Sequence, residues 1–334
     1  MTKVKVKKYQ NFWERNRKSH GYLLKKTLMG YGVSIARFIL LFGMCFLILQ
    51  PILNKISVSF MTEQDLYNPI VISIPEHFTT ENYQLAADIM NYSKGLTNSF
   101  LISLTIAILQ ISMCTLVGYG FARFEFPFKK LLFALVIVVI LVPPQTVSSS
   151  LNIHFMNFDI LGIFKLITGN TINLKDSVIP YYLMSVGCMG LKNGLYIYMI
   201  RQFFRNIPKE LEEAAYVDGC GTLKTFIRIM LPDAKPILTS CFLFAFVWQW
   251  TDGFYSRMFL GGTTLVSTSL STIVDSLGVY IAKGTGLMNQ TVSVAYSNCI
   301  LATGTLMIIL PLIILYLFAQ RGFVESLSSS GIKM

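Results

Sequence analysis

The chain has 334 residues, of which 53% are hydrophobic and 13% are charged, whereas soluble domains carry roughly 25% charged residues. This leaves too little polar surface to cover a water-soluble globule, so the composition excludes an ordinary soluble domain and predicts a membrane protein. The net charge of +11 is compatible with nucleic acid or with a membrane surface as partner, and the positions of the charges decide between them.

The first 34 residues form a basic segment that we expect on the cytoplasmic side of the membrane. A cleaved secretory signal is not expected, because the apolar region comes late and no small-residue cleavage site follows it. Phe12, Trp13 and Tyr22 are interleaved with Lys and Arg, a pattern that fits an interfacial amphipathic helix or a solvated basic tail. Both alternatives stay open on the sequence alone.

Six segments are apolar enough to cross a membrane, which takes about 20 mostly apolar residues per helix. We therefore predict an all-α polytopic membrane protein with six transmembrane helices in a domain spanning residues 35–319. The fourth segment carries Lys192 and Asn193, which indicate either a charge inside the membrane or a span that begins later. The predicted spans are 35–53, 98–120, 131–147, 178–200, 237–258 and 292–319, and a C-terminal tail follows at 320–334.

The distribution of basic residues predicts the orientation of these spans. An even number of spans places both termini on one side, and if that side is the cytoplasm, the inner segments hold 21 of the 28 Lys and Arg residues. The basic excess is then explained by membrane topology and contact with anionic lipid, so we expect a lipid bilayer and no nucleic acid as partner.

The segment 201–236, between the fourth and fifth spans, predicts two short helices joined by a tight turn. Pro208 suits a first helical turn, and three glutamates follow it, where negative charge stabilises the positive end of the helix dipole. Asp218-Gly219 predicts the end of the first helix, because glycine readily adopts the left-handed conformation of a helix exit. The second helix would carry the apolar side chains of Phe226 and Met230 on one face.

The residues of this loop resemble the EAA loop of permease subunits in binding-protein-dependent ABC importers. The likeness extends over about 35–334 and is closest to the carbohydrate-uptake branch, on the side of the smaller maltose-type permease subunit. Cys220, Asp233 and Lys192 depart from the pattern of that branch. The residues that carry the resemblance are Glu213-Ala214-Ala215, Asp218-Gly219, Leu231-Pro232 and Pro236, together with the aromatic-rich segment 118–127, Pro143-Pro144-Gln145 and the segment 320–324.

The resemblance implies a type I ABC importer permease fold in which the loop is a coupling helix that docks onto a cytoplasmic ATPase subunit. Glu213 would form an ion pair with a basic residue of the ATPase, and Glu212 and Asp218 are further candidates for such a pair. The small residues of the loop would allow close packing against the ATPase. The residues implied for this contact are Glu213, Ala214, Ala215, Asp218, Gly219, Leu231 and Pro232.

The resemblance also implies the partners and the location. We expect a second permease subunit in a heterodimer, two ATPase subunits that bind ATP and Mg, and an extracytoplasmic solute-binding protein. The chain itself would be a non-catalytic transport subunit that binds no cofactor, and no G-x-x-x-x-G-K-[ST] motif occurs in it. Its place would be the bacterial cytoplasmic membrane, with several spans and both termini in the cytoplasm.

A translocation path for a sugar or oligosaccharide is expected to be lined by polar residues of otherwise apolar spans, because polar side chains that face lipid are costly. Each candidate for the path could instead form hydrogen bonds between helices. Rival interpretations are a permease for an amino acid, peptide or anion, or a membrane enzyme or receptor. The candidates for the path are Asn98, Gln110, Gln145, Trp248, Gln249, Asp252 and Asn298.

Overall fold

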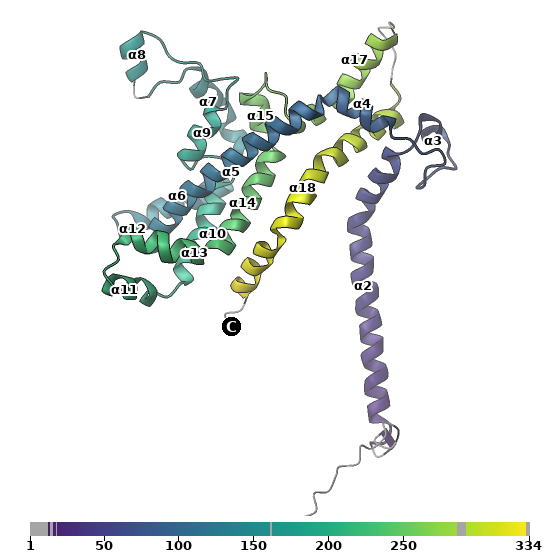
Figure 1. The fold of residues 1–334 in the computed structure, drawn as a ribbon, viewed down its shortest axis with the longest axis horizontal. Helices are drawn as coiled ribbons and strands as arrows, with labels where there is room; N and C mark the ends of the chain where they lie inside the picture. Colours follow the sequence, from purple (N-terminus) through teal and green to yellow (C-terminus); the bar gives the residue numbers. More distant parts are fainter. Residues whose placement is uncertain (1–12, 14–15, 18, 161, 286–291, 332–334) are drawn as a thin grey trace, which may run out of the picture.

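The regular structure is helical, as seen in the computed structural model, which describes residues 13, 16–17, 19–160, 162–285 and 292–331 (Figure 1). In these residues no β-strand occurs, and two isolated bridges join Met61 to Phe78 and Phe158 to Ile172. The helices are α2 (Tyr22–Ser59), α3 (Glu63–Tyr67), α4 (Glu81–Met90), α5 (Tyr92–Arg123), α6 (Lys129–Leu141), α7 (Pro144–Met156), α8 (Ile163–Thr168), α9 (Ile179–Val186), α10 (Asn193–Asn206), α11 (Glu210–Val217), α12 (Thr222–Thr225), a π-helical turn η1 (Phe226–Met230), α13 (Leu231–Asp233), α14 (Lys235–Trp250), α15 (Phe254–Phe259), α16 (Val266–Ser271), α17 (Ile273–Thr285) and α18 (Val294–Gly331).

Three helices are each long and apolar enough to cross a membrane, namely α2, α5 and the part of α18 up to Gln320. They confirm the first, second and sixth predicted spans as continuous helices. Two bent pairs, α6 with α7 and the segment 222–233 with α14, would raise the number among the described residues to five if each pair counts as one span. The predicted total of six stays a prediction.

The first predicted span starts earlier than expected. Helix α2 begins at Tyr22, so the last part of the basic N-terminal segment belongs to the same helix as the apolar stretch after Ile35. Residues 1–12 and three others of this segment lie outside the described residues, and the choice between an interfacial helix and a solvated tail concerns mainly them.

The other three predicted spans are wrong as continuous helices, because each contains a break. Helices α6 and α7 meet at 101° around Val142 and Pro143, where consecutive prolines remove backbone donors and force the preceding residues into an extended conformation. Helices α9 and α10 are separated at residues 187–192, in which Cys188 and Lys192 have positive φ. The predicted fifth span stops at Trp250, and α15 begins at Phe254.

Helix α5 is the centre of the packed core and lies against α10, α14 and α9. Glycine permits close approach at two points: a Cβ on Gly118 would lie 2.9 Å from Ile200 Cγ2, and one on Gly194 would lie 3.0 Å from the Val136 carbonyl oxygen. Large buried side chains such as Tyr196 and Trp250 fill the space between the helices. This tight packing fixes the positions of the helix ends that form the site below.

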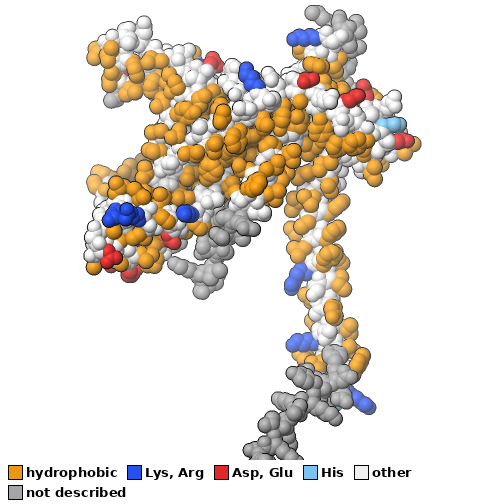
Figure 2. Space-filling model, in the orientation of Figure 1, with side chains coloured by type: hydrophobic (Ala, Val, Ile, Leu, Met, Phe, Trp, Pro, Cys, Tyr) orange, Lys and Arg blue, Asp and Glu red, His pale blue; other side chains and the backbone are white. Residues whose placement is uncertain are grey.

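Helix α2 stands apart from this core and packs mainly against α18 (Figure 1). None of the side chains in its most apolar stretch is buried, and hydrophobic side chains cover its surface in Figure 2. The N-terminal end of α2, the C-terminal end of α18 and the helices α11 to α13 all point towards the lower side of Figure 1.

Candidate functional site

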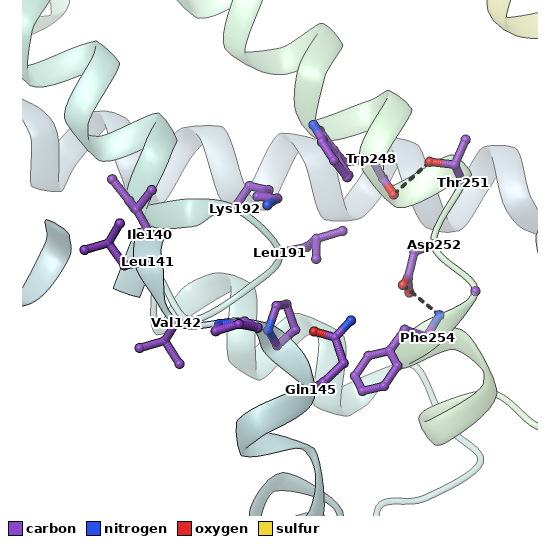
Figure 3. Close-up of a pocket in the computed structure, with 13 residues that line it drawn as sticks. Ile140, Leu141, Val142, Gln145, Leu191, Lys192, Trp248, Thr251, Asp252 and Phe254 are labelled. Atoms are coloured by element: carbon purple, nitrogen blue, oxygen red, sulfur yellow. Dashed lines mark hydrogen bonds between the residues drawn. The ribbon is translucent and has the colours of Figure 1, made fainter. Parts of the chain in front are cut away.

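Three of the helix breaks meet around one cavity of about 500 Å³. The end of α6 and the start of α7 form one wall, the residues before α10 form another, and the end of α14 with the start of α15 forms the third (Figure 3). Irregular backbone at membrane depth is tolerated where it is buried in protein or lines a water-filled cavity, so the breaks and the cavity fit together. The lining residues are Ile140, Leu141, Val142, Pro143, Pro144, Gln145, Leu191, Lys192, Trp248, Thr251, Asp252, Gly253 and Phe254.

A lysine and a tryptophan face each other in this cavity. Lys192 precedes α10 in a left-handed conformation with φ 62°, and its ammonium lies 4.9 Å from the centre of the Trp248 ring. This distance is that of a cation–π interaction. Trp248 is 45% exposed, so much of its ring is open to whatever occupies the cavity.

Asp252 caps the start of α15, two residues after α14 ends at Trp250. Its Oδ1 accepts hydrogen bonds from the backbone N–H groups of Phe254 and Tyr255 at 3.1 and 3.2 Å. Its Oδ2 accepts bonds from the Tyr181 hydroxyl at 2.6 Å, and from the Ser256 N–H at 3.0 Å and hydroxyl at 3.2 Å. The carboxylate therefore starts α15 at the cavity wall and ties it to α9.

The structure brings together three of the seven predicted path residues, namely Gln145, Trp248 and Asp252. The other four do not line this cavity. Asn98 donates a hydrogen bond to the Thr264 carbonyl, and Asn298 is exposed elsewhere on the molecule. Gln110 and Gln249 are 2% and 5% exposed, which places them inside the helix bundle. Whether any of the seven contacts a substrate stays a prediction.

Lys192 lines the cavity although it is not among the seven predicted path residues. The signal that pointed to its position was the alternative of a later helix start, since α10 begins at Asn193, directly after it. The Pro143-Pro144 pair was a second signal, because it predicts a helix break at the same level.

The loop between α10 and α14 forms the predicted turn. Helix α11 begins at Glu210, just after Pro208, so the proline precedes the helix instead of lying in its first turn. Gly219 has φ +79°, and the next backbone N–H, that of Cys220, donates to the Ala215 carbonyl at 2.9 Å. The predicted left-handed exit at Gly219 is therefore confirmed.

One face of α11 is bound to the chain's own core. Glu212 is 7% exposed, its Oε2 lies 3.1 Å from Arg123 Nε, and its Oε1 accepts a hydrogen bond from the Tyr119 hydroxyl at 2.8 Å. The expectation that Glu212 pairs with a basic residue of another protein is wrong, because its carboxylate is already paired within the chain. Arg123 Nη2 also donates to the Ile207 carbonyl at 2.9 Å, which holds the start of the loop.

The other face of α11 is exposed. Glu213, Ala214, Asp218 and Gly219 are open to solvent, whereas Ala215 is 4% exposed and its side chain is covered by the chain itself. Ala215 is thus not available for close packing against a partner in this conformation. Further along the loop, Leu231 is half-buried and Pro232 is exposed. The role of these residues in contacting an ATPase stays a prediction.

A separate polar pair lies in the segment between α2 and α4. The His77 ring nitrogen Nδ1 and Asp65 Oδ1 are 2.8 Å apart, and the His77 backbone N–H donates to the other carboxylate oxygen. The hydrogen bond to Asp65 raises the pKa of His77. Burial acts to raise the pKa of Asp65, but the bonds from His77 outweigh it and the pKa is lowered. The pair ties the segment after α3 back to that helix.

Residues 114–327 match the family profile described as "Binding-protein-dependent transport system inner membrane component". Among similar proteins, an osmoprotective compounds uptake permease of Synechocystis is 33% identical over 193 residues, which are 56% of this chain and 59% of that protein. The maltodextrin transport system permease of Bacillus subtilis is 25% identical over 77% of this chain and 81% of its own length. An arabinooligosaccharides transport permease of Halalkalibacterium halodurans is 24% identical over 86% of this chain and 92% of its own length.

Among solved structures, a chain of a bacterial ABC transporter involved in the import of the acidic polysaccharide alginate has the same fold. The TM-score is 0.60 at 18% identity, and the match covers 86% of this chain and 95% of that one. The segment matched by the family profile is more than half of this chain and contains the cavity residues and the loop with Gly219. The chain therefore belongs to the family of binding-protein-dependent transport system inner membrane components, and it is a non-catalytic membrane subunit that works with an ATPase and a solute-binding protein.

Proposed function

We propose that this chain forms half of the translocation pathway for a sugar or oligosaccharide in an ATP-driven importer. The observation that carries the proposal is the cavity at the meeting point of three helix breaks, in a chain whose relatives include permeases named for maltodextrin and arabinooligosaccharides. Discontinuous helices at membrane depth are a recurring way to build a transport site. Trp248 offers the flat apolar face that suits a sugar ring.

The exposed face of α11 would dock onto an ATPase subunit that binds ATP and Mg. The ion pair between Glu212 and Arg123 supports this role, because it anchors the helix to the end of α5 and lets the loop move with the bundle. Glu213 and Asp218 present free carboxylates to a basic partner surface. In this arrangement the loop and both chain termini lie in the cytoplasm.

A second permease subunit would complete the pathway as a heterodimer with this chain. This chain forms three walls of the cavity, and α2 exposes its apolar surface along most of its length. A partner with the same fold would close the pathway on its open side.

The test is uptake of labelled saccharides by a strain in which the gene for this chain is deleted. We expect the chain to restore uptake of at least one saccharide, and we expect restoration to fail when the partner ATPase carries an inactivating change. Glu213→Lys should lower both uptake and co-purification with the ATPase, with the chain still present in the membrane. Restored uptake of amino acids or peptides, and of no saccharide, would contradict the proposed substrate class.

A further inference from the structure

The cavity holds a lysine that forms no ion pair with a carboxylate of the described residues. Lys192 lines the cavity, and its contact there is the ring of Trp248, whereas the ion pairs found in the described part of the chain involve other residues. A cation–π contact is weaker than an ion pair and leaves the ammonium free to donate hydrogen bonds.

Asp252 lies in the same cavity but forms no ion pair with this lysine. All five of its hydrogen bonds come from Tyr181 and from the first residues of α15, and its side chain is 7% exposed. Both carboxylate oxygens of Asp252 are therefore already engaged by donors of the chain itself. The charged side chain of the cavity that can donate hydrogen bonds to a ligand is Lys192.

The backbone around the cavity carries partial charges of both signs. Helices α7 and α10 start beside the cavity, at Pro144 and Asn193, and helices α6 and α14 end beside it, at Leu141 and Trp250. The partial positive charge of a helix start and the partial negative charge of a helix end oppose each other here. The group that can attract an anion into this space is therefore the Lys192 ammonium (Figure 3).

Lys192 is exposed on this chain, at the far end of a helix expected to cross part of the membrane. Helix α6 has 13 residues and rises about 20 Å, so a start at the membrane surface would place the cavity well inside a hydrocarbon layer about 30 Å thick. Charged side chains at such depths are rare and usually have a function in transport. The volume of about 500 Å³ lies within the range of small-molecule sites, roughly 300–1,000 Å³.

We infer that this cavity binds the anionic group of an acidic saccharide, a carboxylate or a sulfate, through the Lys192 ammonium, with Trp248 as the platform for the sugar ring. The inference rests on the proposed function and adds the chemical class of the substrate. Lys192 is then a specificity-determining residue that favours acidic over neutral saccharides of the same size.

The experiment measures uptake by the complete transporter in the deletion strain, using pairs of saccharides that differ only in the acidic group. Suitable probes are glucuronyl-glucose with cellobiose, digalacturonate with galactobiose, and a sulfated disaccharide with its unsulfated form. The variants are Lys192→Asn, which removes the charge and tolerates a positive φ, and Lys192→Arg, which keeps the charge. Lys165→Asn is the matched control, because Lys165 is an exposed lysine of α8 away from the cavity.

We expect the unmodified chain to take up the acidic member of at least one pair in preference to the neutral one. Lys192→Asn should lower that uptake by about tenfold to hundredfold, as for the loss of a hydrogen bond to a charged group. Lys192→Arg should restore most of it, and Lys165→Asn should leave it unchanged, at equal amounts of chain in the membrane.

Uptake of neutral saccharides alone, or uptake of acidic ones that Lys192→Asn leaves unchanged, would overturn the inference and leave the proposed function standing. Uptake of no saccharide of either kind would overturn the proposed function as well, so the two failures are distinguishable.

Discussion

The carboxylate of Glu212 connects two parts of the chain that are distant in sequence. It pairs with Arg123 at the end of α5, and both side chains are almost fully buried, with exposed fractions of 9% and 5%. The Tyr119 hydroxyl occupies the other carboxylate oxygen. Removal of one partner of such a pair leaves an uncompensated buried charge, which costs about 3–5 kcal/mol.

Glu212→Gln should therefore destabilise the junction between α11 and α5 and lower uptake. The pair of Glu125 with Lys129 provides the control, because the Glu125 side chain is 88% exposed, and exposed pairs contribute only about 0–1 kcal/mol. We expect Glu212→Gln to lower the thermal unfolding midpoint of the purified transporter clearly more than Glu125→Gln does. Equal midpoints for the two variants would show that the buried pair does not hold the loop.

The turn between α11 and α12 depends on backbone conformation and not on available space. Gly219 has φ +79°, Gly221 has φ −75°, and a Cβ added to either would meet nothing within 4 Å. The two glycines lie in the same loop and differ in conformation, so they form a matched pair for mutation.

Gly219→Val should strain the turn by more than the roughly 1–2 kcal/mol typical of a left-handed residue, because valine is β-branched. The exposed face of α11 would then be misaligned, and we expect uptake to fall strongly while the chain stays in the membrane. Gly221→Val should retain most uptake, since its φ suits valine. Uptake is measured by a transport assay and membrane content by immunoblot. Equal uptake by the two variants at equal membrane content would refute the role of the turn.

The arrangement of the whole molecule leaves α2 without a close neighbour over most of its length. Its three glycines, Gly30, Gly32 and Gly43, have no atom of another segment within 4 Å of where a Cβ would lie. Glycine within a helix costs about 1 kcal/mol relative to alanine, and in membranes small residues let another helix approach closely. These positions favour a helix of a second permease subunit as the neighbour of α2.

A photo-reactive residue at Leu47, which is 67% exposed on α2, should therefore crosslink to a second permease subunit in native membranes. The same probe at Leu166, 86% exposed on α8, serves as the control and should give no such product. Products with lipid alone at Leu47 would show that α2 faces the bilayer and not a partner chain.

The sequence by itself determined the helices that follow from a continuous apolar run. A long apolar run has one favourable state in lipid, a helix with its backbone groups satisfied internally, and α2, α5 and α18 follow from this rule. The turn at Gly219 was predictable for a similar reason, because few residues other than glycine adopt its conformation readily.

The tertiary structure alone decided the breaks and the site that they form. Helix α15 starts at the cavity because Asp252 caps it and is itself held by Tyr181 of α9, and Glu212 is buried because Arg123 of α5 faces it. Such contacts join residues far apart in the chain, so hydropathy along the chain does not reveal them. The same packing places three of the seven predicted path residues, and also Lys192, around the cavity. Which side chains meet in space depends on how the helices pack against one another.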